Sequence, residues 1–185
     1  MNYYILQQDP RIIEQPSLLS CPENIDPIAL VGGKKLPVPN TPICLSLSPR
    51  SSDYRGCIID GIVTLFHKYF ITELIRLGVD NFQSFPVELT NPEGEIEIAY
   101  SLINIIGLIK AVNEKESVMK PRYGGWGANL YSFKIDPAKT MGQRLFRLAE
   151  APTLIIIDEW LREKLLVFNP PGVLMLPTER YDGWG

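Results

Sequence analysis

The chain has 185 residues, of which 45% are hydrophobic and 21% charged, a balance typical of a globular protein with a substantial core. Its net charge of −3 gives no reason to expect nucleic acid as a partner, because binding phosphates requires a clustered basic surface. The longest uncharged apolar run, residues 102–109, is too short to cross a membrane, and the N-terminus lacks the pattern of a secretory signal, so we expect a cytoplasmic protein.

The first 52 residues are expected to form a short strand and then an irregular arm. Residues 2–6 carry an aromatic pair in a strand-like run, and residues 7–52 contain eight of the sixteen prolines. Proline fixes φ and removes a backbone donor, so only short extended pieces are expected there, at residues 28–31, 36–38 and 43–47. Because apolar residues persist along the arm, we expect it to pack on a core formed by residues 53–185, within a single domain.

Residues 60–77 predict the clearest helix of the chain. Apolar side chains recur there at spacings of three and four, at Ile62, Phe66, Tyr69, Phe70, Leu74 and Leu77. Asp60 or Thr64 is expected to cap its N-terminus, and Gly78 stands where a left-handed residue ends many helices.

Residues 81–109 predict a β-hairpin that organises the core. The first arm alternates between apolar and other residues, and Asn91-Pro92-Glu93-Gly94 has the composition of a type I turn. The second arm is expected to bury Ile96, Ile98, Tyr100 and Leu102 and to expose Glu95 and Glu97. From Leu102 onwards the run is apolar on both faces, which is typical of a central strand, and its Asn104 is expected to be a buried amide satisfied by the backbone.

The C-terminal part alternates short strands with one further helix. Strands are expected at residues 129–135, 145–148, 153–157 and 173–176. Asp158 is expected to cap a helix that begins at Glu159 and ends before Pro170. Strands and two main helices without strict alternation favour an α+β fold with a mixed or antiparallel sheet.

Few residues suggest catalysis or metal binding. His67 is the only histidine and has no partner motif, so a packing or surface role is favoured. Cys21, Cys44 and Cys57 lack the spacing of a zinc site or a disulfide scaffold, and we expect free, mostly buried thiols. Residues 32–35 (GGKK) lack the remainder of a phosphate-binding loop and predict a plain turn. We therefore expect no catalytic residues, metal or cofactor.

The densest acidic group lies on the hairpin and comprises Glu88, Glu93, Glu95 and Glu97. A solvated edge is the simplest interpretation, and an acidic docking surface for a partner is the second. A converging carboxylate pair, as a hydrolase would need, is the third.

Two near-repeats, RYGGWG at residues 122–127 and RYDGWG at residues 180–185, each present an Arg, a Tyr and a Trp on a glycine-rich backbone. These residue types dominate protein-interface hot spots, so Arg122, Tyr123 and Trp126 are candidates for partner binding. The alternative is that the rings anchor loops onto the protein, and this alternative is favoured for the C-terminal copy.

The order of several weak motifs resembles a bacterial family. A tyrosine-rich start (NYYIL) precedes VDNFQSFPVEL, the strand YSLINI, a polar EKES, LFRLAEAPTLIIIDEWLREKL and a closing PPGVLMLP. This order is similar to that of the immunity proteins of polymorphic toxin systems formerly classed as a domain of unknown function (the Imm11 or DUF1629 family). The similarity covers most of the chain, and most clearly its C-terminal two thirds.

The resemblance implies a non-catalytic protein that binds and blocks a toxin encoded beside it. Two alternatives remain open from the residues alone: a small hydrolase that uses a carboxylate pair, and a regulatory module that binds a different protein.

Overall fold

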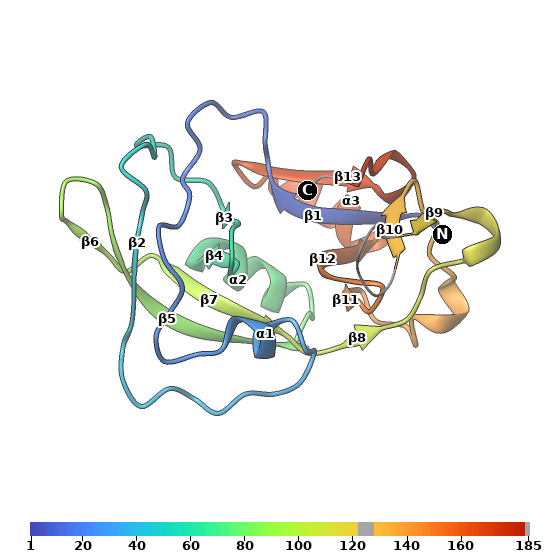
Figure 1. Ribbon diagram of the computed structural model, residues 1–185, viewed down its shortest axis with the longest axis horizontal. Helices are drawn as coiled ribbons and strands as arrows, with labels where there is room; N and C mark the ends of the chain where they lie inside the picture. Colours follow the sequence, from blue (N-terminus) through green and yellow to red (C-terminus); the bar gives the residue numbers. More distant parts are fainter. Residues whose placement is uncertain (122–127, 184–185) are drawn as a thin grey trace.

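A computed structural model describes residues 1–121 and 128–183, which form an α+β fold, as predicted. Within these residues the strands make up two large sheets and one two-stranded sheet (Figure 1). The two large sheets lie at opposite ends of the long axis of the molecule. Each has one of the two main helices, α2 (Lys68–Arg76) or α3 (Glu159–Phe168), packed beside it.

The first large sheet has the strand order β13-β1-β12-β11-β8. Its members are β1 (Tyr3–Gln8), β8 (Leu108–Ile109), β11 (Leu145–Leu148), β12 (Ala151–Asp158) and β13 (Val173–Pro177). All pairs are antiparallel except β11 with β8, which is parallel. The first strand of the chain, β1, therefore lies between its last two strands, β12 and β13.

The second large sheet has the strand order β2-β5-β7-β4-β3, and β6 also pairs with β5. Its members are β2 (Ile43–Ser46), β3 (Ile58–Ile59), β4 (Leu65–His67), β5 (Phe82–Thr90), β6 (Ile96–Glu97) and β7 (Tyr100–Ile105). Every residue of β7 is buried, which confirms the predicted central strand for residues 102–105. The prediction is wrong for residues 106–109, where β8 belongs to the first sheet and Leu108 is exposed. β7 gives way at Gly107 (φ +127°) to β8, which carries the chain into the first sheet.

The helix predicted at residues 60–77 is wrong in its first half. Residues 65–67 form β4, which pairs with β7, and α2 covers only Lys68–Arg76. His67, rather than Asp60 or Thr64, is the N-cap, because its Nδ1 accepts a hydrogen bond from the Tyr69 backbone N–H at 3.2 Å. The predicted apolar stripe also fails at Ile62 and Tyr69, which are 59% and 74% exposed, because residues 62–70 do not form one continuous helix. Gly78 follows with φ +77°, as expected for the end of this helix.

The second main helix follows the sequence prediction. α3 (Glu159–Phe168) begins after Asp158, whose Oδ1 accepts from the Leu161 N–H at 2.7 Å. It ends at Asn169, which has left-handed backbone angles, immediately before Pro170.

Three apolar clusters hold the layers together. The largest contains side chains of both sheets and both main helices, including Leu6, Phe66, Phe70, Ile157 and Leu161. A second cluster lies on the other side of the first sheet and includes Phe133 and Phe146. The third lies on the other side of the second sheet and includes side chains of the arm.

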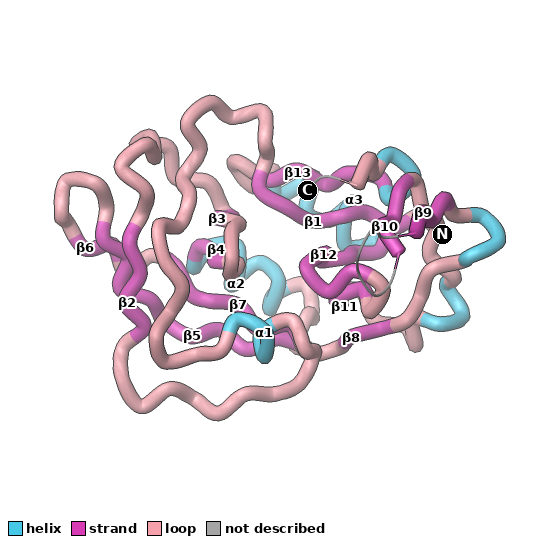
Figure 2. The backbone as a smooth tube through the Cα atoms, viewed as in Figure 1, coloured by secondary structure: helices cyan, strands magenta, loops and turns pink. Residues whose placement is uncertain are grey.

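The arm is mostly loop but is attached at specific points (Figure 2). Residues 28–31, predicted as extended, lie mainly in the short helix α1 (Pro27–Leu30), and residues 36–38 form no strand. Asp26 caps α1 and Pro27 starts it, a combination that favours a helical turn over an extended piece. The piece predicted at residues 43–47 corresponds to β2.

The fully buried Asn104 on β7 explains part of this attachment. Its Nδ2 donates to the Lys34 backbone oxygen at 2.8 Å and to Gln83 Oε1 at 2.9 Å. Gln83 in turn exchanges two hydrogen bonds with the Leu36 backbone. The predicted backbone partner is confirmed for the amide nitrogen, whereas the Asn104 side-chain oxygen is buried without a donor.

The cysteines are free, but the prediction that they are mostly buried is wrong. Cys21 and Cys44 are exposed and Cys57 is buried. Cys21 lies on the arm and Cys44 alternates with buried Ile43 and Leu45 along the edge strand β2. None of the helices in residues 1–121 and 128–183 has the length and hydrophobicity needed to cross a membrane.

Candidate functional site

The tip of the hairpin is built by the predicted turn. The Gly94 N–H donates to the Asn91 carbonyl oxygen at 3.0 Å, and the Glu95 N–H donates to Asn91 Oδ1 at 2.8 Å. Gly94 has φ +88°, a conformation that few other residues adopt readily. The turn therefore projects a short β5–β6 ribbon beyond the body of the sheet (Figure 1).

The second arm differs from the predicted burial pattern at three positions. Ile96 and Ile98 were expected to be buried, yet they are 61% and 63% exposed, whereas Glu97 is half-buried. The register explains this, since Glu97 pairs with the buried Leu89 and Ile96 pairs with Thr90. The chain leaves strand geometry between β6 and β7, so alternation does not continue from Ile96 to Tyr100.

A surface that we call the hairpin face results from this register, and it consists of Pro86, Glu88, Ile96 and Ile98. Three of these residues line a shallow groove of about 480 Å³, whose other walls are Lys68 and the arm at residues 38–43. Val38 on that arm is 73% exposed. The groove therefore combines apolar walls with one carboxylate and one ammonium group.

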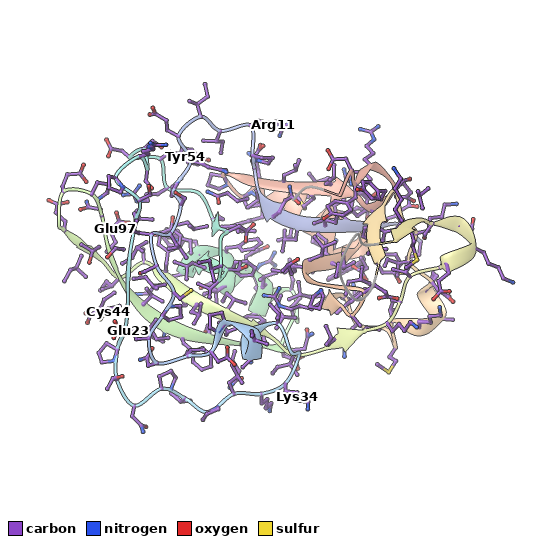
Figure 3. All side chains as sticks on the ribbon, in the orientation of Figure 1. Arg11, Glu23, Lys34, Cys44, Tyr54 and Glu97 are labelled. Carbon is purple, nitrogen blue, oxygen red and sulfur yellow. The ribbon has the colours of Figure 1, made fainter. Side chains whose placement is uncertain are left out.

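The four glutamates of the hairpin are held in separate environments. Glu97 accepts from the Arg55 guanidinium at 2.8 and 2.9 Å and forms a half-buried ion pair with it. Glu95 accepts from Asn91, Glu88 accepts from the Cys44 thiol at 3.8 Å, and Glu93 is exposed at the turn. Figure 3 shows Glu97 and Cys44 at the same end of the molecule. Since Glu97 stands opposite Leu89 in the register, it lies on the other face of the ribbon from Glu88, and this separation does not favour the carboxylate pair that a hydrolase requires.

The other predicted partner-binding residues, Arg122, Tyr123 and Trp126, lie outside the described residues. In the C-terminal near-repeat, Tyr181 packs edge-on against Phe133 with ring centroids 5.8 Å apart. Tyr181 therefore anchors its segment to the protein, which was the interpretation favoured for this copy.

His67 serves the structure of α2. Its ring packs against Tyr100 and Tyr69, at centroid distances of 5.1 and 4.9 Å. Burial, with a smaller contribution from Lys68, holds the pKa of His67 below its usual range. The side chain is therefore neutral at pH 7, as its role as an N-cap acceptor requires.

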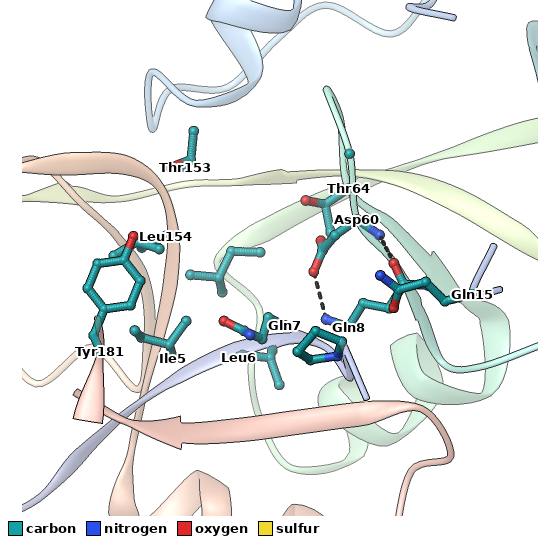
Figure 4. A pocket seen from close by; sticks show the side chains of 13 residues that line it. Ile5, Leu6, Gln7, Gln8, Gln15, Asp60, Thr64, Thr153, Leu154 and Tyr181 are labelled. Atoms are coloured by element: carbon teal, nitrogen blue, oxygen red, sulfur yellow. Dashed lines mark hydrogen bonds between the residues drawn. The ribbon is translucent and has the colours of Figure 1, made fainter. Parts of the chain in front are cut away.

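A second concave site, which sequence patterns did not indicate, lies where β1 and β12 approach the loop after β3 (Figure 4). Its volume is about 370 Å³. We call it the Asp60 pocket. Ile5, Leu154 and the Tyr181 ring lie at one side of it, and Asp60, Thr64 and Gln15 lie at the other.

Asp60 is held by a reciprocal pair of hydrogen bonds with Gln8. The Asp60 Oδ2 accepts from the Gln8 N–H at 2.7 Å, and the Asp60 N–H donates to Gln8 Oε1 at 2.9 Å. Gln8 Nε2 donates to the Pro16 carbonyl oxygen at 3.0 Å, so the amide is fixed from both ends. Desolvation raises the pKa of Asp60, while hydrogen bonds from Gln8 and Thr64 and the charge of Arg147 oppose this shift.

Arg147 on β11, whose charge acts on Asp60, is a buried cation and is 3% exposed. Its Nη1 donates to the carbonyl oxygens of Pro152 and Thr153 at 3.0 and 3.1 Å, and its Nε is buried without an acceptor. Desolvation lowers its pKa to about 10, so it stays charged at pH 7. No ion pair between Asp60 and Arg147 is found in the part of the chain that the structure describes.

The sequence offered no signal for the pocket itself, but it did mark the buried charge that acts on Asp60. Arg147 stands between Phe146 and Leu148 in an apolar strand, where a charge needs a specific partner. Asp60 gave no such signal, because an Asp before Gly fits a cap or a turn equally well.

Among the described residues no group of three His, Cys, Asp or Glu side chains could hold a metal ion. No protein-family model matches the chain, and no curated protein matches it either.

Proposed function

We propose that this protein is an immunity protein, which binds a bacterial toxin encoded beside it and blocks the toxin in the cytoplasm without catalysis. The order of sequence motifs supports this proposal, and so does one structural observation. The hairpin face presents two isoleucines, Ile96 and Ile98, that are 61% and 63% exposed on a ribbon projecting from the fold. Neighbouring exposed apolar side chains on a projecting element are characteristic of protein-interaction surfaces.

The chemistry of the hairpin face defines the kind of partner surface that would fit it. It combines apolar side chains with acidic ones, since Glu88 lines the groove with Ile98 and the exposed Glu93 and Glu95 come just before Ile96 in the chain. An apolar patch with a basic rim on the toxin would complement both features. A stable complex needs a buried area of roughly 1,200–2,000 Å² in total, so flanking arm residues such as Val38 would take part.

The test is co-expression with the product of the adjacent reading frame. We expect that product to be toxic when expressed alone, harmless with this protein, and recovered with it as a complex. Replacing Ile96 and Ile98 together with Asp is expected to abolish protection. The matched control is Val167→Asp on α3, since Val167 is 85% exposed and lies on a different element.

Two outcomes would reject the proposal. One is a neighbouring product that is harmless alone, and the other is toxicity that persists in the presence of this protein. A complex with a non-toxic protein would instead support the alternative of a regulatory module. For the hydrolase alternative, the separate environments of the hairpin glutamates provide no support.

A further inference from the structure

We propose that the Asp60 pocket binds a small organic cation, namely an ammonium or guanidinium group on a short apolar stem. This inference does not depend on the toxin proposal, because the pocket and the hairpin face share no residue.

The polar side of the pocket is rich in acceptors. The Asp60 carboxylate offers about four acceptor positions, of which hydrogen bonds from Gln8 and Thr64 use two. Gln15, which also lines the pocket, has a buried side-chain oxygen that no donor satisfies. An ammonium group has three N–H donors and a guanidinium has five, which suits several acceptors at one end of a cavity.

The Asp60 carboxylate at this end of the pocket also has no direct ion pair among the described residues. Arg147 attracts Asp60 at a distance, but its Nη1 donates to the carbonyl oxygens of Pro152 and Thr153. Because desolvation raises the pKa of Asp60, a cationic head group bound beside it would stabilise its ionised form, and a carboxylate without a direct ion pair favours a cationic ligand over a neutral one. An anion is disfavoured, because Arg147 is buried and does not line the pocket.

The remaining walls fit the stem of such a ligand. Ile5, Leu154 and the Tyr181 ring provide an apolar side opposite Asp60 (Figure 4). The volume of about 370 Å³ lies within the range of small-molecule sites, roughly 300–1,000 Å³. A head group that donates hydrogen bonds at the Asp60 end and an alkyl stem against Leu154 would use both sides at once.

The test is an NMR titration of the ¹⁵N-labelled full chain at pH 8 and constant ionic strength. The probes are n-butylammonium and n-butylguanidinium chloride, with n-butanol as the uncharged control. We expect saturable shifts at the amides of Thr64 and Leu154 with both cations, and no saturation with butanol. Asp60→Asn should weaken cation binding by about tenfold or more, because it removes a charge-assisted hydrogen bond.

A second variant keeps the test decisive if Asp60→Asn does not fold. Thr153 lines the pocket and its side chain is exposed, so Thr153→Trp should narrow the pocket without disturbing the core. We expect it to abolish the saturable shifts, while Thr72→Trp on the exposed side of α2 should leave them unchanged. Equal saturation by butanol, or unchanged cation affinity in either pocket variant, would overturn the proposal.

Discussion

Replacing Asn104 with Ala should loosen the attachment of residues 34–36 of the arm to the second sheet and lower stability by about 2–3 kcal/mol. The change removes the donors to the Lys34 carbonyl oxygen (2.8 Å) and to Gln83 Oε1 (2.9 Å). Each hydrogen bond contributes roughly 1 kcal/mol net, and the Lys34 carbonyl oxygen, whose hydrogen bond is part-buried, adds a cost at the lower end of about 1–3 kcal/mol when it is left unpaired. Part of this loss is offset, because the Asn104 side-chain oxygen is already buried without a donor and its desolvation cost disappears.

The assays are urea unfolding and thermal unfolding, both followed by circular dichroism, with hydrogen exchange at the Leu36 amide as a local probe. At about 2–4 °C per kcal/mol for a chain of this length, the melting temperature should fall by roughly 5–10 °C. The Leu36 N–H, which donates to Gln83 Oε1 at 2.8 Å, should exchange faster. Asn40→Ala on the exposed part of the arm is the matched control and should change stability little. A loss below about 0.5 kcal/mol in Asn104→Ala would refute this reasoning, since surface substitutions reach that value.

Two further predictions concern groups whose pKa is shifted. Because the folded state lowers the pKa of His67, this residue contributes stability that is present above its unfolded pKa near 6.5 and is lost as pH falls through the lower folded value. His67→Asn keeps an N-cap acceptor for Tyr69 and should make the free energy of unfolding depend less on pH between about pH 7 and 5, as measured by thermal unfolding. An unchanged pH dependence would contradict the assignment. In native protein, a thiol-specific dye should label Cys21 and Cys44 quickly and Cys57 only on unfolding, because burial raises the pKa of Cys57 to about 11; equal labelling of all three would contradict this.

Elements with local signals were predictable from the sequence. Asp158 marks the boundary between β12 and α3, because a capping side chain and the start of an amphipathic run coincide there. The turn at Asn91–Gly94 was predictable for a similar reason, since its hydrogen bonds join residues close in the chain.

Features set by distant partners were not predictable in the same way. Residues 65–67 are a strand because they pair with β7, a contact that no local spacing reveals. The exposure of Ile96 depends on the register that places Glu97 opposite Leu89, and on the break that follows. The Asp60 pocket joins residues from both ends of the chain, so its composition appears only in the folded protein.

The central proposal is tested most directly by the affinity between this protein and the product of the adjacent reading frame. Calorimetry would measure this affinity for the unsubstituted chain and for the Ile96→Asp/Ile98→Asp double variant. Burying each isoleucine contributes about 1.5 kcal/mol or more, so the double variant should bind roughly 100-fold more weakly. Val167→Asp should bind as the unsubstituted chain does. Absence of binding by the unsubstituted chain, or equal affinity of the double variant, would contradict the account.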